Sequence, residues 1–364
     1  MDNEKKVSLA FAAIEKSVIN NIPKQEEGEA RGKNYVTWGS DNMYPEFLFG
    51  LYQSVTTLRT VIEAISDYTT GNDARCTVAG FEKVMNRKGD TMNDILKYLA
   101  KDYLLYGCAA AQVVRDKAGR VSEIYYVDAR FIRTDKKNQI FYYSEEYAKK
   151  WARSSKVLVY PAYVPDAVTI PTSIIYVKNN VVNAYGVPVY TPAIKDCMIE
   201  QKIEEMHLNS LDNNFMASYI VNFLNGIPTD EQKAEIERNI QEKFCGSENA
   251  GRILLNFANG KDNAALLQKL EITDFADKYN AAATRSREQI YAAFRMIPQV
   301  CGIMSESTGF NEQEFAQSFK LVNRTVVRPV QKKICDMFDK IFQVTGSVAI
   351  EPFSIENNTE QTVR

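Results

Sequence analysis

The hydrophobic period of this 364-residue chain changes at Gly107, and this change constrains its fold more than any other feature. Before Gly107, apolar residues recur at the spacing of one helix face and predict three helices in succession, of which the first carries Val7, Phe11, Ile14 and Val18 and stops before Pro23. Ser54 is the expected N-cap of the second helix and Gly71 follows its end, whereas Thr91 and Gly107 delimit the third. The first third of the chain is therefore predicted to be helical.

After Gly107 the sequence becomes rich in Val, Ile and Tyr, which are typical of strands. The segments 116–119 and 135–138 carry Asp, Gly and Asn in the positions expected of hairpin turns. Hairpins that follow consecutive helices indicate an α+β domain. The predicted strands cover 111–115, 121–127, 139–143, 157–160 and 174–182.

Pro188 and Pro192 mark a return to helix. A helix is predicted over 193–216, and another begins at Thr273 or Asp274 and ends near Pro298. Between them we predict a small α/β insert, with strands at 219–224 and 252–257 and a helix over 231–244. A chain that leaves its core on one helix and returns on another holds the insert at a distance, which suits an assembly component better than an enzyme. The last helix, over 312–343, is expected to be interrupted at Pro329.

The composition offers little catalytic chemistry. His207 is the only histidine and lies in a charged helical stretch, where we expect it to be exposed or partly packed. The six cysteines form no CxxC pair, so neither a zinc site nor a redox motif is predicted, and no cofactor is expected. The N-terminus does not resemble a signal peptide, and no apolar run is long enough to span a membrane.

The charges nearly balance, with 44 Lys and Arg against 46 Asp and Glu for a net charge of −2. This balance argues against a protein that grips nucleic acid through bulk charge. An enzyme is the competing class, for example a metal-dependent nuclease that pairs Asp128 with Glu123 or with Glu145 and Glu146. Such pairs arise by chance in a chain with this many acids.

An ordered series of motifs resembles the HK97-like portal proteins of tailed bacteriophages. The series comprises Tyr185-Gly186-Val-Pro188, Asn214-Phe215-Met-Ala-Ser218, Asn249-Ala250-Gly251-Arg252 before a strand, Ile290 to Pro298 with Phe294, Asn311 to Phe315, and Arg328-Pro329. The match is strong over about 170–345 and less specific before it. A head-completion adaptor is the third possibility, but such proteins usually lack two long helices around an insert.

The resemblance implies a portal fold with an α+β wing, two long stem helices, a small α/β clip insert and a kinked C-terminal helix. The implied segments are the wing at 1–190, the first stem helix at 191–216, the clip at 217–272, the second stem helix at 273–297, the tunnel loop at 298–311, the wing or crown helix at 312–343 and a short tail at 344–364.

The resemblance also implies a function without catalysis. Portal proteins form a ring, expected here to be a dodecamer, at one capsid vertex of the virion, and the ring assembles in the host cytoplasm. Double-stranded DNA passes through it, and it contacts the major capsid protein, the large terminase and later the head–tail adaptor. The residues implied to face DNA are Met304, Ser305, Glu306, Ser307 and Thr308, and those implied to dock terminase or adaptor are Glu231, Glu235, Arg238, Asn249 and Arg252.

Glu306 is the only charged residue between Arg295 and Glu312, so a ring would repeat its carboxylate around the duplex. A Glu on an ordinary solvated loop is the simpler interpretation. The first stem segment carries five acids and two lysines, which favours a solvated helix face, with an acidic channel wall as the alternative. The near-neutral net charge of the chain is then consistent with a ring through which DNA passes without being tightly bound.

Overall fold

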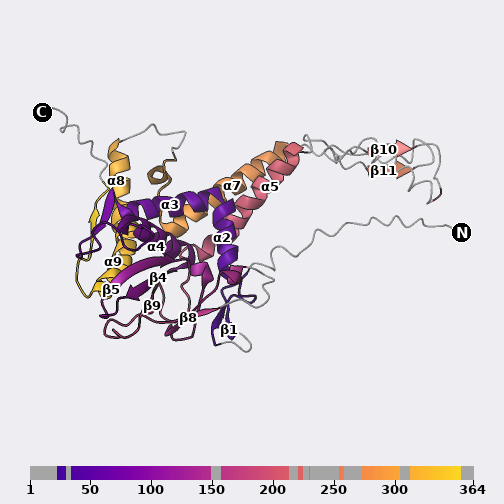
Figure 1. Ribbon diagram of the computed structural model, residues 1–364. Helices are drawn as coiled ribbons and strands as arrows, with labels where there is room; N and C mark the ends of the chain where they lie inside the picture. The colour runs from indigo at the N-terminus through magenta and orange to yellow at the C-terminus, as the bar shows by residue number, and fades with distance from the viewer. Residues whose placement is uncertain are drawn as a thin grey trace. The chain divides into compact units, whose positions relative to one another are not determined.

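The computed structural model describes residues 23–29, 34–148, 157–212, 220–223, 229, 254–257, 273–303 and 312–353. The chain divides into two units, one formed by Met1–Thr191 with Phe294–Arg364 and the other by Pro192–Ala293 (Figure 1). The first unit is thus built from both ends of the sequence, and each unit is described by itself.

Three helices lie in the described N-terminal part of the first unit, α2 (Tyr44–Ser54), α3 (Thr56–Thr70) and α4 (Met92–Tyr106). The helix predicted to carry Val7 to Val18 lies outside the described residues. Thr91 caps α4 as predicted, in a capping box with Asp94, and Gly107 ends it in the left-handed conformation with φ of 74°. The prediction for Ser54 was wrong. Its hydroxyl donates to the Gly50 carbonyl at the end of α2, and α3 begins after Val55 without a side-chain cap. Ser54 is therefore the last residue of the preceding helix rather than the cap of the next one.

Three antiparallel strands form the central sheet in the order β5-β4-β9, with bounds Val121–Val127, Cys108–Arg115 and Thr172–Lys178. In its middle strand, Ala110 pairs with Val127 on one side and Tyr176 on the other. A second sheet has the order β6-β7-β8, with bounds Ile132–Thr134, Ile140–Tyr143 and Leu158–Pro161. Both predicted turns are present, since the side chains of Asp116 and Asp135 accept backbone N–H groups within them.

Short elements complete the N-terminal part of the first unit. Strands β1 (Glu27–Glu29) and β2 (Val36–Trp38) form an antiparallel pair. The 3-10 helices η1 (Ala129–Phe131) and η2 (Glu145–Ala148) connect larger elements, and η3 (Thr191–Ala193) spans the residues where the first unit ends and the second begins.

The C-terminal part of the chain returns to the first unit. It consists of α8 (Glu312–Val322), a π-helix η6 (Asn323–Val327), α9 (Arg328–Phe342) and β12 (Val348–Glu351). The helix is not broken at Pro329, where an interruption was expected, because α9 includes this residue in its first turn. The irregularity is the π-turn, which ends at Val327, two residues before the proline that cannot donate to the preceding turn. The N–H of Arg328 bonds the Asn323 carbonyl five residues back instead.

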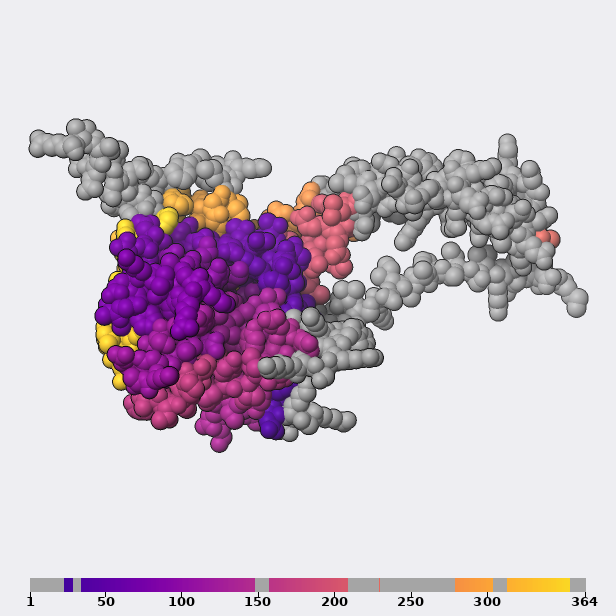
Figure 2. All heavy atoms as spheres, in the orientation of Figure 1, coloured from indigo at the N-terminus to yellow at the C-terminus, as the bar shows by residue number. Residues whose placement is uncertain are grey.

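Strand β12 pairs antiparallel with β3 (Asp73–Cys76), a pairing that the sequence did not predict. The carboxylate of Asp339 fixes the turn before β12, because it accepts from the N–H of Gly346 at 3.1 Å and from the N–H and hydroxyl of Ser347 at 2.9 and 2.6 Å. In the space-filling view, the orange and yellow surface of the C-terminal elements borders the indigo surface of the N-terminal ones (Figure 2).

Helices α3, α4 and α9 bury their apolar faces in one core, as amphipathic helices do. Leu58, Leu99 and Phe338 are fully buried there. Next to it, the Trp38 and Tyr185 rings stack at 4.2 Å. The guanidinium of Arg133, also buried, donates to the side chain and the carbonyl of Asn42 and to two further backbone carbonyls.

The second unit contains α5 (Ile194–Asp212), most of α7 (Thr273–Phe294), and strands β10 (Ile220–Phe223) and β11 (Leu254–Phe257). Strands β10 and β11 pair in parallel, which requires a crossover between them. The predicted helix 231–244 falls in that crossover, outside the described residues. No helix within the described ranges is both long and apolar enough to cross a membrane.

Candidate functional site

The residues predicted to face DNA or to dock partner proteins lie outside the described part of the chain. This holds for Met304, Ser305, Glu306, Ser307 and Thr308 of the expected tunnel loop. It also holds for Glu231, Glu235, Arg238, Asn249 and Arg252 of the expected clip. The structure does describe both flanks of the 304–311 segment, and these flanks define the candidate site.

The upstream flank is a rigid turn. Helix α7 ends at Phe294, Arg295 takes a left-handed conformation with φ of 55°, and Pro298 opens the 3-10 helix η5 (Pro298–Cys301). Gly302 then adopts φ of 81°, and its N–H bonds the Gln299 carbonyl at 3.0 Å. The proline fixes its own φ and the glycine accepts the positive one, so the sequence Pro-x-x-x-Gly specifies this turn.

Tyr68 of α3 joins the two flanks. Its hydroxyl donates to the Val300 carbonyl at 2.6 Å, and its ring meets the Phe319 ring of α8 edge-on at 5.1 Å. Phe353 packs against both rings, at 5.2 and 5.5 Å. Burial raises the pKa of Tyr68, so the hydroxyl stays protonated and remains a donor at neutral pH. One side chain, 232 positions from Val300 in sequence, therefore holds both ends of the 304–311 segment.

A second aromatic contact lies within the first unit and involves Phe294, the last residue of α7. The Tyr190 and Phe294 rings stack at 5.3 Å, and the Tyr190 hydroxyl donates to the Leu105 carbonyl at 2.9 Å. Both rings are buried. The sequence analysis had placed Phe294 in a motif but gave Tyr190 no role, because a lone Tyr after a proline carries no local signal.

The acids of helix α5 were expected to lie on a solvated face, and only some of them do. His207 and Glu204 are exposed, and Glu205 pairs with Lys202 at 2.5 Å. Glu200, however, is buried, with 4% of its surface exposed. The acids of this helix are thus not equivalent, and Glu200 cannot contribute to a solvent-facing wall in the described chain.

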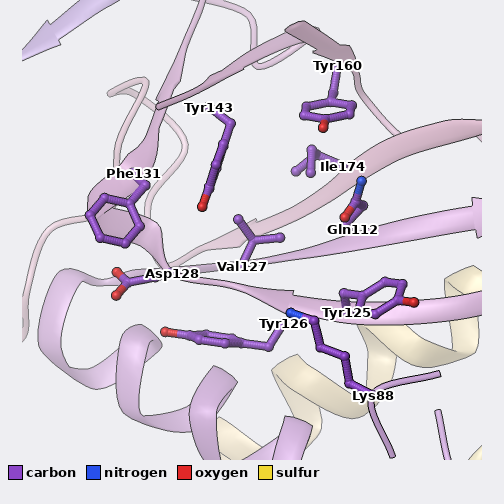
Figure 3. Close-up of a pocket in the computed structure, with 10 residues that line it drawn as sticks. All are labelled: Lys88, Gln112, Tyr125, Tyr126, Val127, Asp128, Phe131, Tyr143, Tyr160 and Ile174. Atoms are coloured by element: carbon purple, nitrogen blue, oxygen red, sulfur yellow. The ribbon is translucent and has the colours of Figure 1, made fainter. Parts of the chain in front are cut away.

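Three of the four carboxylates proposed for a nuclease are already paired with other side chains, whereas the buried Oε2 atom of Glu146 has no hydrogen-bond partner among the described residues. Asp128 lines a pocket of about 510 Å³ together with residues that include Tyr125, Tyr126, Tyr143 and Tyr160 (Figure 3). Asp128 accepts from the guanidinium of Arg130 at 2.7 and 3.1 Å, and Glu123 pairs with Arg87 at 2.6 Å. Glu145 instead accepts from the Tyr143 hydroxyl at 3.2 Å. Among the described residues, no group of three or more His, Cys, Asp or Glu could hold a metal ion.

Asp102 is the most perturbed acid of this region. It is almost fully buried, and its Oδ2 atom accepts from the Tyr126 hydroxyl and from the Ala129 N–H, both at 3.0 Å. Burial, and next the charge of Asp128, raise its pKa well above the usual range. Its two hydrogen bonds join α4 to the end of β5, which is a structural role.

The cysteines of the described chain are free thiols. Burial raises the pKa of Cys108 and Cys301 to about 12 and that of Cys335 to about 11. A thiol must lose its proton to act as a nucleophile, so these groups are poorly suited to catalysis at neutral pH.

A family model described as phage portal protein matches residues 83–364. Two curated relatives, each named only "uncharacterized protein", come from Rickettsia bellii (strain RML369-C) and Rickettsia felis (strain ATCC VR-1525 / URRWXCal2). They are 32% identical over 147 residues and 33% identical over 124 residues, which covers 39% and 34% of this chain. The matches span 36% and 30% of the relatives, so the chain covers about a third of their length.

Solved structures share the fold. One is titled as the neck of a native gene transfer agent particle computed with C12 symmetry, with a TM-score of 0.53 and 16% identity over 85% of this chain and 84% of that chain. Another is an HK97 family phage portal protein from Corynebacterium diphtheriae, with a TM-score of 0.52 and 10% identity over 83% and 95%. These likenesses confirm the α+β fold that the sequence predicted.

Proposed function

Because this chain belongs to the phage portal protein family, we propose that its copies form a closed ring at one vertex of a capsid, through which DNA enters during packaging and leaves during ejection. As a portal protein it is a component of the virion. The family match over 83–364 carries this proposal. The partition of the chain supports it, since the segment 192–293 leaves the first unit as one insert and the chain then returns to it.

A ring of twelve copies is the expected assembly. The gene transfer agent neck that shares this fold was computed with C12 symmetry, and rotational symmetry closes a ring through one repeated head-to-tail contact. Within the ring, 191–216 and 273–297 are proposed as the stem, 217–272 as the clip and 298–311 as the tunnel loop. Glu231, Glu235, Arg238, Asn249 and Arg252 are then the proposed docking residues of the clip for terminase and adaptor.

The protein is proposed to act mechanically rather than catalytically. Tyr68 contacts both flanks of the 304–311 segment, which suits a loop that must project from a fixed base. Glu306 is the charged residue of this segment. The ring is expected to dock terminase during packaging, a head–tail adaptor afterwards, and the major capsid protein at its outer rim.

Native mass spectrometry and negative-stain microscopy of the purified protein test this function. We expect particles with an axial hole and a mass of about twelve times the 41.3 kDa chain. A compact monomer at micromolar concentration would count against the ring. Divalent-dependent cleavage of DNA by the same preparation would instead support the nuclease.

A further inference from the structure

Four cations recur at four-residue intervals along the continuous helix formed by α8, η6 and α9. They are Lys320, Arg324, Arg328 and Lys332, and all four are exposed. We call this set the basic column. Within the described residues, no ion pair or side-chain hydrogen bond engages any of them. No acid occurs between Lys320 and Lys332, so their positive charge is not offset locally.

The π-turn brings the basic column closer to a straight line. In an α-helix, four residues overshoot a full turn by about 40°, so a four-residue repeat would wind around the helix. The π-helix Asn323–Val327 holds more residues in each turn, which reduces that drift where the column crosses it. Arg324 lies within the π-helix, and Lys320 and Arg328 flank it. The column therefore presents one charged face rather than a spiral.

The opposite face of this helix is fixed in the core. Val322, Val327 and Ile334 are buried, and the side-chain amide of Gln331 donates to the Thr69 carbonyl at 3.0 Å. These contacts prevent the helix from rotating about its axis. The basic column consequently stays on the solvent side, and only its own side chains need ordering when it binds a partner.

We propose that the basic column binds the phosphate backbone of double-stranded DNA, an inference that rests on the proposed function. Four helical residues rise about 6 Å. Phosphates along one strand of a duplex are spaced about 3.4 Å apart along its axis, so successive cations can meet about every second phosphate. Contacts to phosphate alone read no sequence and permit sliding. They therefore suit a cargo that moves, and they are local enough to coexist with a net charge of −2.

DNA binding by purified rings tests the basic column. A labelled duplex of about 30 base pairs is titrated in fluorescence anisotropy at several salt concentrations, with wild type, the neutralised variant K320Q/R324Q/R328Q/K332Q, and the control K24Q/K83Q/K117Q/K137Q. The control removes the same charge at four other exposed lysines. We expect the affinity of the column variant to fall roughly tenfold or more at low salt, and its salt slope to flatten by about 0.9 for every phosphate that is no longer neutralised. The control keeps the wild-type slope.

Three outcomes would overturn the proposal. The column variant and the control could weaken binding equally, which would indicate bulk charge. Binding could stay unchanged in both. The column variant could also lose its ring in native mass spectrometry where the control and the single variant R324Q keep it, which would make the column a contact to an acidic surface of a second copy. If wild type forms no ring, the proposed function fails, and the comparison of the two quadruple variants still reports on the column.

Discussion

The backbone of Gly186 packs directly against that of Gly107, with no room for a Cβ atom on either residue. A Cβ on Gly107 would lie 2.5 Å from the Val187 nitrogen, and one on Gly186 would overlap the Gly107 carbonyl. Gly107 also ends α4 in the left-handed conformation, and its carbonyl accepts from the Asn179 N–H at 3.0 Å. This contact joins the end of α4 to the segment that leads toward α5.

Replacing Gly186 with alanine should destabilise the first unit. The obstructing atoms belong to backbone, which cannot rotate away, so we expect a loss of at least about 1–3 kcal/mol in the free energy of unfolding, measured by urea denaturation. Gly50 is the matched control. It lies within α2, where an added Cβ atom would meet nothing within 4 Å, so Gly50→Ala should stabilise by about 0.5–1 kcal/mol. Equal effects of the two substitutions would contradict the close packing.

Tyr68→Phe tests whether the Tyr68 hydroxyl helps to hold the two flanks of the candidate tunnel loop. The substitution keeps the ring against Phe319 but removes the hydrogen bond to the Val300 carbonyl, and we expect a loss of about 0.5–1.5 kcal/mol in the free energy of unfolding. Limited proteolysis should then cut the 304–311 segment faster. Tyr98→Phe is the control, because 43% of that side chain is exposed and its change should stay within about 0.5 kcal/mol. Unchanged cleavage in Tyr68→Phe would show that the ring alone holds the flanks.

Asp102→Asn should make stability less dependent on pH. Burial, then the charge of Asp128, raises the pKa of Asp102, so the folded protein binds this proton more tightly than the unfolded chain does. The free energy of unfolding of wild type therefore falls as the pH rises above the ordinary aspartate pKa of 3.8, by at most about 1.4 kcal/mol per pH unit. Asparagine has no such proton, yet it can accept from Tyr126 and Ala129. The free energy of unfolding of the variant, relative to that of wild type, should thus increase in thermal melts as the pH rises above the ordinary aspartate pKa of 3.8.

Asp116→Asn provides the control of opposite sign. Hydrogen bonds, first from the Arg120 backbone, lower the pKa of the partly exposed Asp116 carboxylate. Its contribution is therefore present above the ordinary pKa and lost as the pH falls through the folded one. Asp116→Asn should lower the free energy of unfolding at neutral pH and should change it less in acid. A difference between Asp102→Asn and wild type that does not vary with pH would show that Asp102 is not protonated in the folded state.

Glu306→Lys tests the proposed tunnel loop. If this side chain is repeated around the duplex, reversing its charge adds a second ring of phosphate contacts to those proposed for the basic column, and the added attraction should slow or stall DNA during packaging. We expect rings of normal mass by native mass spectrometry but a several-fold lower yield of packaged DNA protected from nuclease. Glu26→Lys makes the same charge change at an exposed position and should package normally. Normal packaging by Glu306→Lys would remove the role proposed for this residue.

Local signals were sufficient where the deciding contacts are local. The capping box of Thr91 and Asp94, the left-handed Gly107 and the Asp turns at 116 and 135 depend on residues close together in sequence, and the structure contains all of them. The prediction for Ser54 failed because the same residue type serves the end of one helix and the start of the next. Only the preceding helix α2, whose pattern was not assigned, distinguishes the two.

The sequence by itself determined the α+β class and the succession of α3, α4, β4 and β5, because hydrophobic period and turn chemistry are properties of neighbouring residues. Tertiary structure alone decided the pairing of β12 with β3, the clamp of Tyr68 on Val300 and Phe319, the burial of Glu200 and the exclusion of any side chain at Gly107 and Gly186. These features join residues that lie far apart in the sequence or depend on how helices pack. Their energies come from burial and close approach, which exist only once the chain has folded.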